Sequence, residues 1–125
     1  MIVGVPRERH DERRVALIPA SIAALRKAGL EVLVEPGAGV PAGYPDAQYT
    51  EKGAQLAASR EALYEAADII LRVRAAGAEP DHAAEELRRL RPGQRLIGQM
   101  EPLWAPDFMP PLAQAGVEAY ALELI

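Results

Sequence analysis

The stretch Leu25-Arg-Lys-Ala-Gly-Leu-Glu-Val-Leu-Val-Glu35 holds the end of a helix, a glycine and a strand with no loop between them. Gly29 stands where a helix ends in a left-handed residue, a conformation that glycine adopts without steric cost. The same pattern returns at Leu112-Ala-Gln-Ala-Gly-Val-Glu-Ala119. Repeated helix–strand units of this kind predict a mostly parallel sheet covered by helices.

Short apolar runs alternate with segments of helical period along the rest of the chain. The predicted strands are Ile2–Val5, Glu31–Glu35, Ala54–Ala57, Ile69–Val73, Leu96–Gln99 and Glu118–Leu122. The predicted helices begin near Pro19, Asp46, Ser59, Asp81 and Asp107. The fold class is therefore α/β, a three-layer α/β/α single domain of flavodoxin or Rossmann type.

Composition limits the classes of function. The chain has 125 residues, enough for one domain, and a formal net charge of −4. Its basic residues are scattered among acidic ones, which argues against a nucleic-acid partner. Cysteine is absent, so thiolate chemistry and cysteine-ligated zinc are excluded. No signal peptide and no membrane-spanning run is evident, and we expect a soluble cytoplasmic protein.

The loop after the second predicted strand, Gly37-Ala-Gly-Val-Pro-Ala-Gly43, formally matches a dinucleotide-binding fingerprint. That fingerprint works only where a helix opens and its first amides surround a pyrophosphate. Pro41, Gly43 and Pro45 break such a helix. We therefore interpret the segment as a glycine-rich turn.

The loop after the first predicted strand is rich in charge and follows a carboxyl end, where open α/β sheets place their ligands. Arg14 is the best candidate for an anion-binding residue because it adjoins apolar Val15-Ala-Leu17 and should be partly buried. The competing interpretation is a solvated loop of mutually paired charges, and composition alone favours it. His10 has no second histidine nearby, so no metal site is expected there.

Arg72-Val73-Arg74 ends the fourth predicted strand, and strict alternation would place both arginines on one face. Glu101 follows the next strand and could lie beside them. These groups could bind an anion or form a structural ion pair, and the ion pair is favoured because ion pairs at sheet edges need no function. No nucleophile–base pair is evident, so no catalytic residue is assigned.

The chain resembles the amino-terminal domain of the alanine dehydrogenase and NAD(P) transhydrogenase family over essentially its whole length. The matching segments are Ile2-Val-Gly-Val-Pro-Arg-Glu8, Arg14-Val-Ala-Leu-Ile-Pro19, Ala28-Gly29, Val34-Glu-Pro-Gly-Ala-Gly39, Tyr49-Thr-Glu-Lys-Gly-Ala54, Ala67-Asp-Ile-Ile70 and Ala119-Tyr-Ala-Leu-Glu-Leu-Ile125.

Two positions separate the branches of this family. Alanine dehydrogenases carry a catalytic lysine in the region of Arg72-Val73-Arg74 and a catalytic histidine at Glu101 or its neighbour, while their carboxylate-binding arginine matches Arg14. Without the lysine and the histidine, oxidative deamination lacks its proton-transfer groups. The resemblance is therefore closer to the alpha subunit of proton-translocating NAD(P) transhydrogenase.

This resemblance implies a cofactor, partners and a location. The cofactor is NAD(H) in the intact subunit, bound chiefly by a second, glycine-rich subdomain that we expect to be absent here, so the 125 residues alone should bind it weakly. The partners are the remainder of the alpha subunit, the NADP(H)-binding and membrane subunits, and a second copy in a homodimer. The complex would be cytoplasmic and peripheral to the inner membrane.

Two alternatives remain open. The chain could be the amino-terminal domain of an amino-acid dehydrogenase that uses Arg14 with altered partners. It could also be a non-catalytic interaction module that uses the fold only for assembly.

Overall fold

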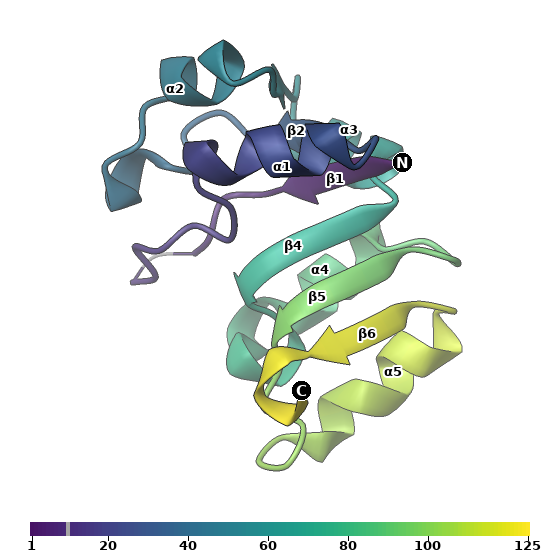
Figure 1. Cartoon of the computed structure of the whole chain (residues 1–125). Helices are drawn as coiled ribbons and strands as arrows, with labels where there is room; N and C mark the ends of the chain where they lie inside the picture. Colours follow the sequence, from purple (N-terminus) through teal and green to yellow (C-terminus); the bar gives the residue numbers. More distant parts are fainter. Residues whose placement is uncertain (10) are drawn as a thin grey trace.

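The computed structural model describes residues 1–9 and 11–125. They form a six-stranded, all-parallel sheet in the order β3-β2-β1-β4-β5-β6 (Figure 1). The strands are β1 (Ile2–Val5), β2 (Glu31–Val34), β3 (Gln55–Leu56), β4 (Ile69–Arg74), β5 (Arg95–Gln99) and β6 (Glu118–Ala121). The helices are α1 (Ile22–Lys27), α2 (Asp46–Glu51), α3 (Arg60–Ala66), α4 (Ala83–Arg89) and α5 (Met109–Gln114).

This order confirms the predicted α/β class and is that of a Rossmann-type sheet. Each predicted strand and helix is present, with ends displaced by up to three residues. Short 3-10 turns precede or follow several elements: Pro19–Ser21, Val40–Ala42, Ala76–Ala78, Pro80–His82, Pro106–Phe108 and Leu122–Leu124.

The two matching helix–strand units close in the same way. Gly29 has φ +83° and Gly116 has φ +71°, both in the left-handed region. The following amides reach back over the glycine, from Leu30 N to the Leu25 carbonyl (3.0 Å) and from Val117 N to the Leu112 carbonyl (3.1 Å). This bond satisfies a carbonyl that the helix end would otherwise leave unpaired. The repeated sequence pattern therefore encodes a repeated backbone geometry.

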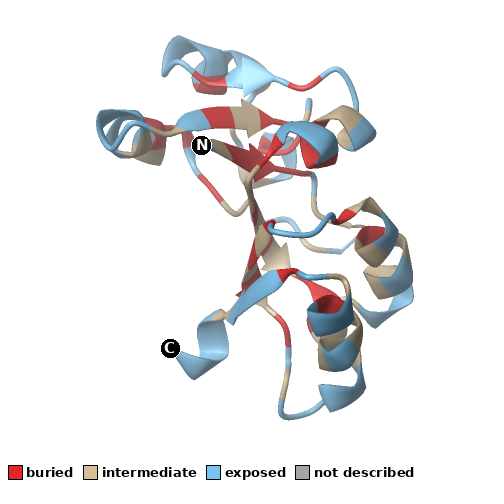
Figure 2. Ribbon diagram, turned by 90° about the vertical axis from the view of Figure 1, so that its right-hand side faces the viewer, coloured by how far each residue is buried: buried red, intermediate tan, exposed pale blue. Residues whose placement is uncertain are grey.

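Two apolar cores lie on opposite faces of the sheet. One cluster packs α1 and α2 against β1 and β2 and includes Ile22, Val34 and Tyr49. The other packs α3, α4 and α5 against the opposite face and includes Leu63, Ile70 and Leu96. Figure 2 shows the buried residues concentrated along the strands and the inward sides of the helices. The three predicted layers are thus present.

The helical layer formed by α1 and α2 covers only half of its face of the sheet. Figure 1 shows α1 lying over β1 and β2, whereas no α-helix among the described residues crosses the same face of β4, β5 and β6. Leu71 and Ile97 are consequently only half-buried there, and Tyr120 is exposed.

Gly4 sets the distance between β1 and α3. A Cβ atom at this position would lie 2.8 Å from the Ala67 Cβ and 2.8 Å from the Leu63 Cδ2. Such distances are far below van der Waals contact, so the absence of a side chain lets α3 pack directly on the central strand.

Candidate anion site at the centre of the sheet

Parallel strands β1 and β4 are neighbours at the centre of the sheet, and the chain leaves them in opposite directions. The crossover after β1 runs through α1 on one face, whereas that after β4 runs through α4 on the other. Diverging connections leave a crevice outside the carboxyl ends of such strands, which is where α/β proteins bind ligands. Arg14 follows β1 and Arg74 ends β4, so two of the three predicted candidates lie at this crevice.

Arg14 makes a two-pronged ion pair with Glu12. Its Nε lies 2.8 Å from Oε1 and its Nη2 lies 2.7 Å from Oε2 of the carboxylate. The hydrogen bond from Arg14 lowers the pKa of Glu12 to about 2, and the same bond raises the pKa of Arg14. The Arg14 side chain is 63% exposed, so the predicted partial burial is wrong. Val15 and Ala16 pack against the core, whereas the neighbouring Arg14 guanidinium lies at the surface.

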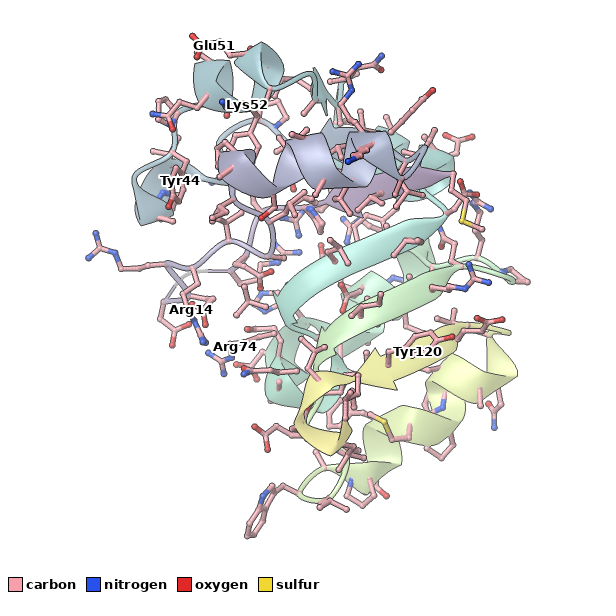
Figure 3. The ribbon with its side chains drawn as sticks, viewed as in Figure 1. Arg14, Tyr44, Glu51, Lys52, Arg74 and Tyr120 are labelled. Atoms are coloured by element: carbon pink, nitrogen blue, oxygen red, sulfur yellow. The ribbon has the colours of Figure 1, made fainter. Side chains whose placement is uncertain are left out.

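Arg74, the last residue of β4, contacts the same loop after β1 that carries Glu12 and Arg14. Its Nε donates to the Ala78 carbonyl at 2.9 Å, and its Nη1 lies 3.6 Å from the Asp11 carboxylate. Arg74 also contributes to the low pKa of Glu12, after the larger effects of Arg14. In Figure 3 the labelled Arg14 and Arg74 side chains point to the same region below the β1 loop. The two guanidinium groups thus converge on the consecutive carboxylates of Asp11 and Glu12.

The register of β4 changes before Arg74. Leu71 pairs with Ile97, but Arg74 pairs with Gln99, so β4 carries one residue more than β5 over this interval. An extra residue of this kind is a β-bulge, and it reverses the alternation of side chains beyond it. The expectation that Arg72 and Arg74 share a face is therefore wrong. Arg72 turns toward α3 and α4, and Arg74 turns toward the crevice.

Arg72 occupies a buried cluster that the sequence did not reveal. Its guanidinium bonds the carboxylates of Glu86 and Glu8 and the hydroxyl of Tyr64, and its residue surface is only 4% exposed. Burial alone would lower the pKa of Arg72, but Glu86, Tyr64 and Glu8 outweigh it, so the pKa is raised. Burial, followed by the charge of Glu86, raises the pKa of Tyr64.

The sequence could not single out the acidic members of this cluster. Glu86 lies in a charged helix, and only the side of α4 that it occupies reveals that it is buried. Glu8 belongs to a run of charges whose members cannot be told apart without the fold.

Glu101 lies beyond β5 in a left-handed conformation, with φ +53°. Its amide donates to the Glu123 carboxylate at 2.5 Å, and the neighbouring Met100 amide does so at 2.8 Å. Within residues 1–9 and 11–125, no hydrogen bond or ion pair joins the Glu101 carboxylate to Arg72 or Arg74. A left-handed non-glycine residue is a strained position, of the kind found near functional sites.

The glycine-rich loop does not fit a pyrophosphate. Helix α2 begins only at Asp46, and the Asp46 carboxylate already accepts the Gly37 amide at 2.8 Å. A Cβ atom on Gly39 would lie 2.5 Å from the Tyr49 hydroxyl, so this glycine is needed for packing. The predicted glycine-rich turn is therefore the better description.

Metal and membrane sites were also considered. The described part of the chain contains no cluster of three or more histidine, cysteine, aspartate or glutamate side chains able to hold a metal ion. His10, for which no metal site was expected, lies outside the described residues. Among the described helices none is long and apolar enough to cross a bilayer.

Comparisons with known proteins agree with this architecture. A family model described as "Alanine dehydrogenase/PNT, N-terminal domain" matches residues 4–125. The chain is 36% identical over its full length to the NAD(P) transhydrogenase subunit alpha of Cereibacter sphaeroides, covering 23% of that protein. It is 41% identical over 78% of its length to an alanine dehydrogenase of Mycobacterium tuberculosis, covering 25% of that protein.

The fold comparison points the same way. The crystal structure of a transhydrogenase from Sinorhizobium meliloti superposes on the whole chain with a TM-score of 0.88 and 32% identity, and the chain covers 36% of it. The chain thus spans about a quarter to a third of the relatives it matches. These relatives are oxidoreductases. The chain belongs to the family of alanine dehydrogenase/PNT amino-terminal domains.

Proposed function

We propose that the chain is the amino-terminal part of the NAD(H)-binding alpha subunit of an NAD(P) transhydrogenase. In the full complex, hydride passes between NAD(H) and NADP(H) and is coupled to proton translocation. The observation that carries the proposal is the segment Arg72-Val73-Arg74 at the crevice end of β4, where the resemblance implies a proton-transferring lysine in alanine dehydrogenases. A guanidinium stays protonated at all physiological pH values and cannot act as a general base.

Transhydrogenation does not need a residue of that kind. Hydride moves directly between two nicotinamide rings, and the protein supplies orientation and exclusion of water. A sheet edge whose charged groups, among the described residues, are arginines paired with carboxylates suits this task. Since the glycine-rich loop does not fit a dinucleotide, NAD(H) would be held mainly by the remainder of the subunit, with this chain as one wall of the cleft.

Arg14 and Arg74 are proposed to bind an anionic group, a carboxylate or a phosphate, at the crevice between β1 and β4. Arginine recognises both groups through two parallel hydrogen bonds. The Glu12 carboxylate already engages Arg14 in this geometry, so it occupies the position that a ligand anion would take. Glu101, after β5, is proposed to line the same edge of the sheet.

The proposed partners are the remainder of the alpha subunit, the NADP(H)-binding and membrane subunits, and a second copy of the chain. The proposed location is the cytoplasmic side of the inner membrane, reached through the complex. The match of the whole chain to 23% of a transhydrogenase alpha subunit supports both proposals.

Deleting the gene in its host tests the proposal. Membranes of the deletion strain should lose NADPH-driven reduction of thio-NAD⁺, and a plasmid copy of the gene should restore it. Unchanged transhydrogenation in the deletion strain would refute the proposal. Calorimetry supplies a second test, because the isolated 125 residues should show no micromolar binding of NADH.

An amino-acid dehydrogenase is the second candidate, favoured by Arg14, which matches the carboxylate-binding arginine of alanine dehydrogenases. Loss of alanine-dependent NAD⁺ reduction in the same deletion strain, with transhydrogenation intact, would establish this alternative.

A further inference from the structure

The β4 bulge leaves backbone groups that the sheet cannot satisfy. Between the pairs Leu71–Ile97 and Arg74–Gln99 the ladder is interrupted, and it resumes with the bond from Ala75 N to the Gln99 carbonyl at 2.8 Å. An interrupted ladder exposes amides, and a buried amide without an acceptor is costly. A bulge at this place therefore needs an acceptor from outside the sheet.

Glu8 supplies that acceptor. Its Oε1 accepts the Val73 amide at 2.8 Å and its Oε2 accepts the Arg74 amide at 3.3 Å. Each oxygen also accepts from the Arg72 guanidinium, at 3.2 Å from Nε and 3.4 Å from Nη2. The Glu8 side chain is 2% exposed. All its acceptor positions are taken by the bulge, so it has none left for a ligand.

The bulge in turn determines where Arg74 points. Without the extra residue, Arg74 would lie on the face of Arg72, against α3 and α4. With it, the guanidinium reaches the Ala78 carbonyl and Asp11 at the crevice. The carboxylate of Glu8 comes from the loop after β1, so one residue ties the two central strands together at the crevice.

We infer that Glu8 is a positioning residue: it holds the β4 bulge and thereby directs Arg74 into the anion site between β1 and β4. The inference rests on the anion site proposed above. Glu8 touches neither ligand nor reacting atoms and acts only through the bulge backbone and Arg72.

Glu35 provides a matched control. It is a glutamate at the carboxyl end of β2, the other neighbour of β1, and it accepts a backbone amide, that of Arg7, at 2.7 Å. It also pairs with an arginine, Arg60, at 3.1 Å, and its side chain is 13% exposed. Among the described residues, its side chain bonds Arg7 and Arg60, neither of which belongs to β4. Glu8→Gln and Glu35→Gln therefore each remove one carboxylate charge close to Arg7, but only Glu8 contacts the bulge.

The experiment measures amide hydrogen exchange by NMR and the binding of two anions, acetate and phosphate. Comparing the two anions distinguishes a site for carboxylates from a site for phosphates. Glu8→Gln keeps one acceptor oxygen but loses the charge and the second oxygen. It should speed exchange of the Val73 and Arg74 amides by about tenfold or more and shift the Arg74 Nε–Hε signal. Anion binding should weaken by a similar factor, and Glu35→Gln should change none of these.

A second variant reaches the bulge without altering Glu8. A Cβ atom on Gly98 would lie 2.6 Å from the Arg72 carbonyl oxygen, so Gly98→Ala presses on the bulge from β5. It should shift the same signals and weaken anion binding, and it keeps the inference testable if Glu8→Gln does not fold.

Unchanged Val73 and Arg74 exchange in Glu8→Gln, or an equal effect of Glu35→Gln, would overturn the inference. If the unaltered chain binds neither acetate nor phosphate, the anion site is refuted. In that case, faster exchange confined to the Val73 and Arg74 amides in Glu8→Gln would still show that Glu8 stabilises the bulge in β4.

Discussion

Replacing Arg72 by methionine should destabilise the chain severely. Arg72 is 4% exposed, and its two carboxylate partners, Glu8 and Glu86, have side chains 2% and 8% exposed. Methionine fills a similar volume but leaves both carboxylates buried without a cation. Breaking a buried ion pair from one side costs about 3–5 kcal/mol. That is a large part of the roughly 5–15 kcal/mol by which a domain is stable.

The loss should depend on pH. Near neutral pH the variant must bury uncompensated negative charge, whereas at lower pH a proton can take the place of the missing cation. The folded variant then binds a proton that the unfolded chain does not, so its deficit relative to the unaltered chain shrinks as the pH falls toward 5. The sign follows from linkage. Where the folded variant binds more protons than the unfolded chain, its free energy of unfolding decreases as the pH rises and increases as the pH falls.

Urea unfolding followed by circular dichroism, at pH 7.5 and pH 5, measures both effects. Arg95→Met is the control, because the Arg95–Glu118 pair lies on the surface, with side chains 37% and 54% exposed, and should contribute little. A deficit for Arg72→Met no larger than that of the control, or one that is the same at both pH values, would refute the reasoning.

Three further changes test the local structure. Gly4→Ala should cost about 1–3 kcal/mol because the new methyl group collides with α3; an unchanged urea midpoint would show that the helix can move away. Ser59→Ala removes the hydroxyl that caps α3 and should cost about 1 kcal/mol, whereas Ser21→Ala, at a helix start without a side-chain cap, should not change the midpoint. The pKa of Glu12 is lowered from the ordinary 4.5 to about 2. Its ion pair therefore stabilises the fold at pH values above 4.5, and this stabilisation is lost as the pH falls toward 2. Glu12→Gln should therefore lose less stability than the unaltered chain between pH 5 and pH 2.5 in acid titrations followed by circular dichroism.

Local rules were sufficient for most of the fold. The glycine that ends each helix, the β-branched strand after it and the repetition of this unit predict a parallel sheet, because each is a property of a few consecutive residues. The Ser59 hydroxyl that caps α3 and the Glu85–Arg89 ion pair on α4 join residues three and four positions apart, so they too depend only on local sequence.

The candidate site was predictable only in part. Chain order alone places Arg14 and Arg74 at carboxyl ends of strands, and the strand order then makes β1 and β4 neighbours. The exposure of Arg14 and the opposite orientations of Arg72 and Arg74 were not predicted, because they depend on a loop and a bulge. Alternation along a strand predicts the face of a side chain only while the register is unbroken.

By itself, the sequence determined the parallel α/β architecture, the absence of cysteine chemistry and an arginine at the end of the fourth strand. Only the tertiary structure decided which charges are structural and which face the crevice. Glu8 and Glu12 look alike in the sequence, yet Glu8 is buried against the bulge and Glu12 pairs with Arg14. Burial and pairing arise from contacts between residues distant in the chain, such as Glu8 and Val73, and these exist only once the strands have assembled.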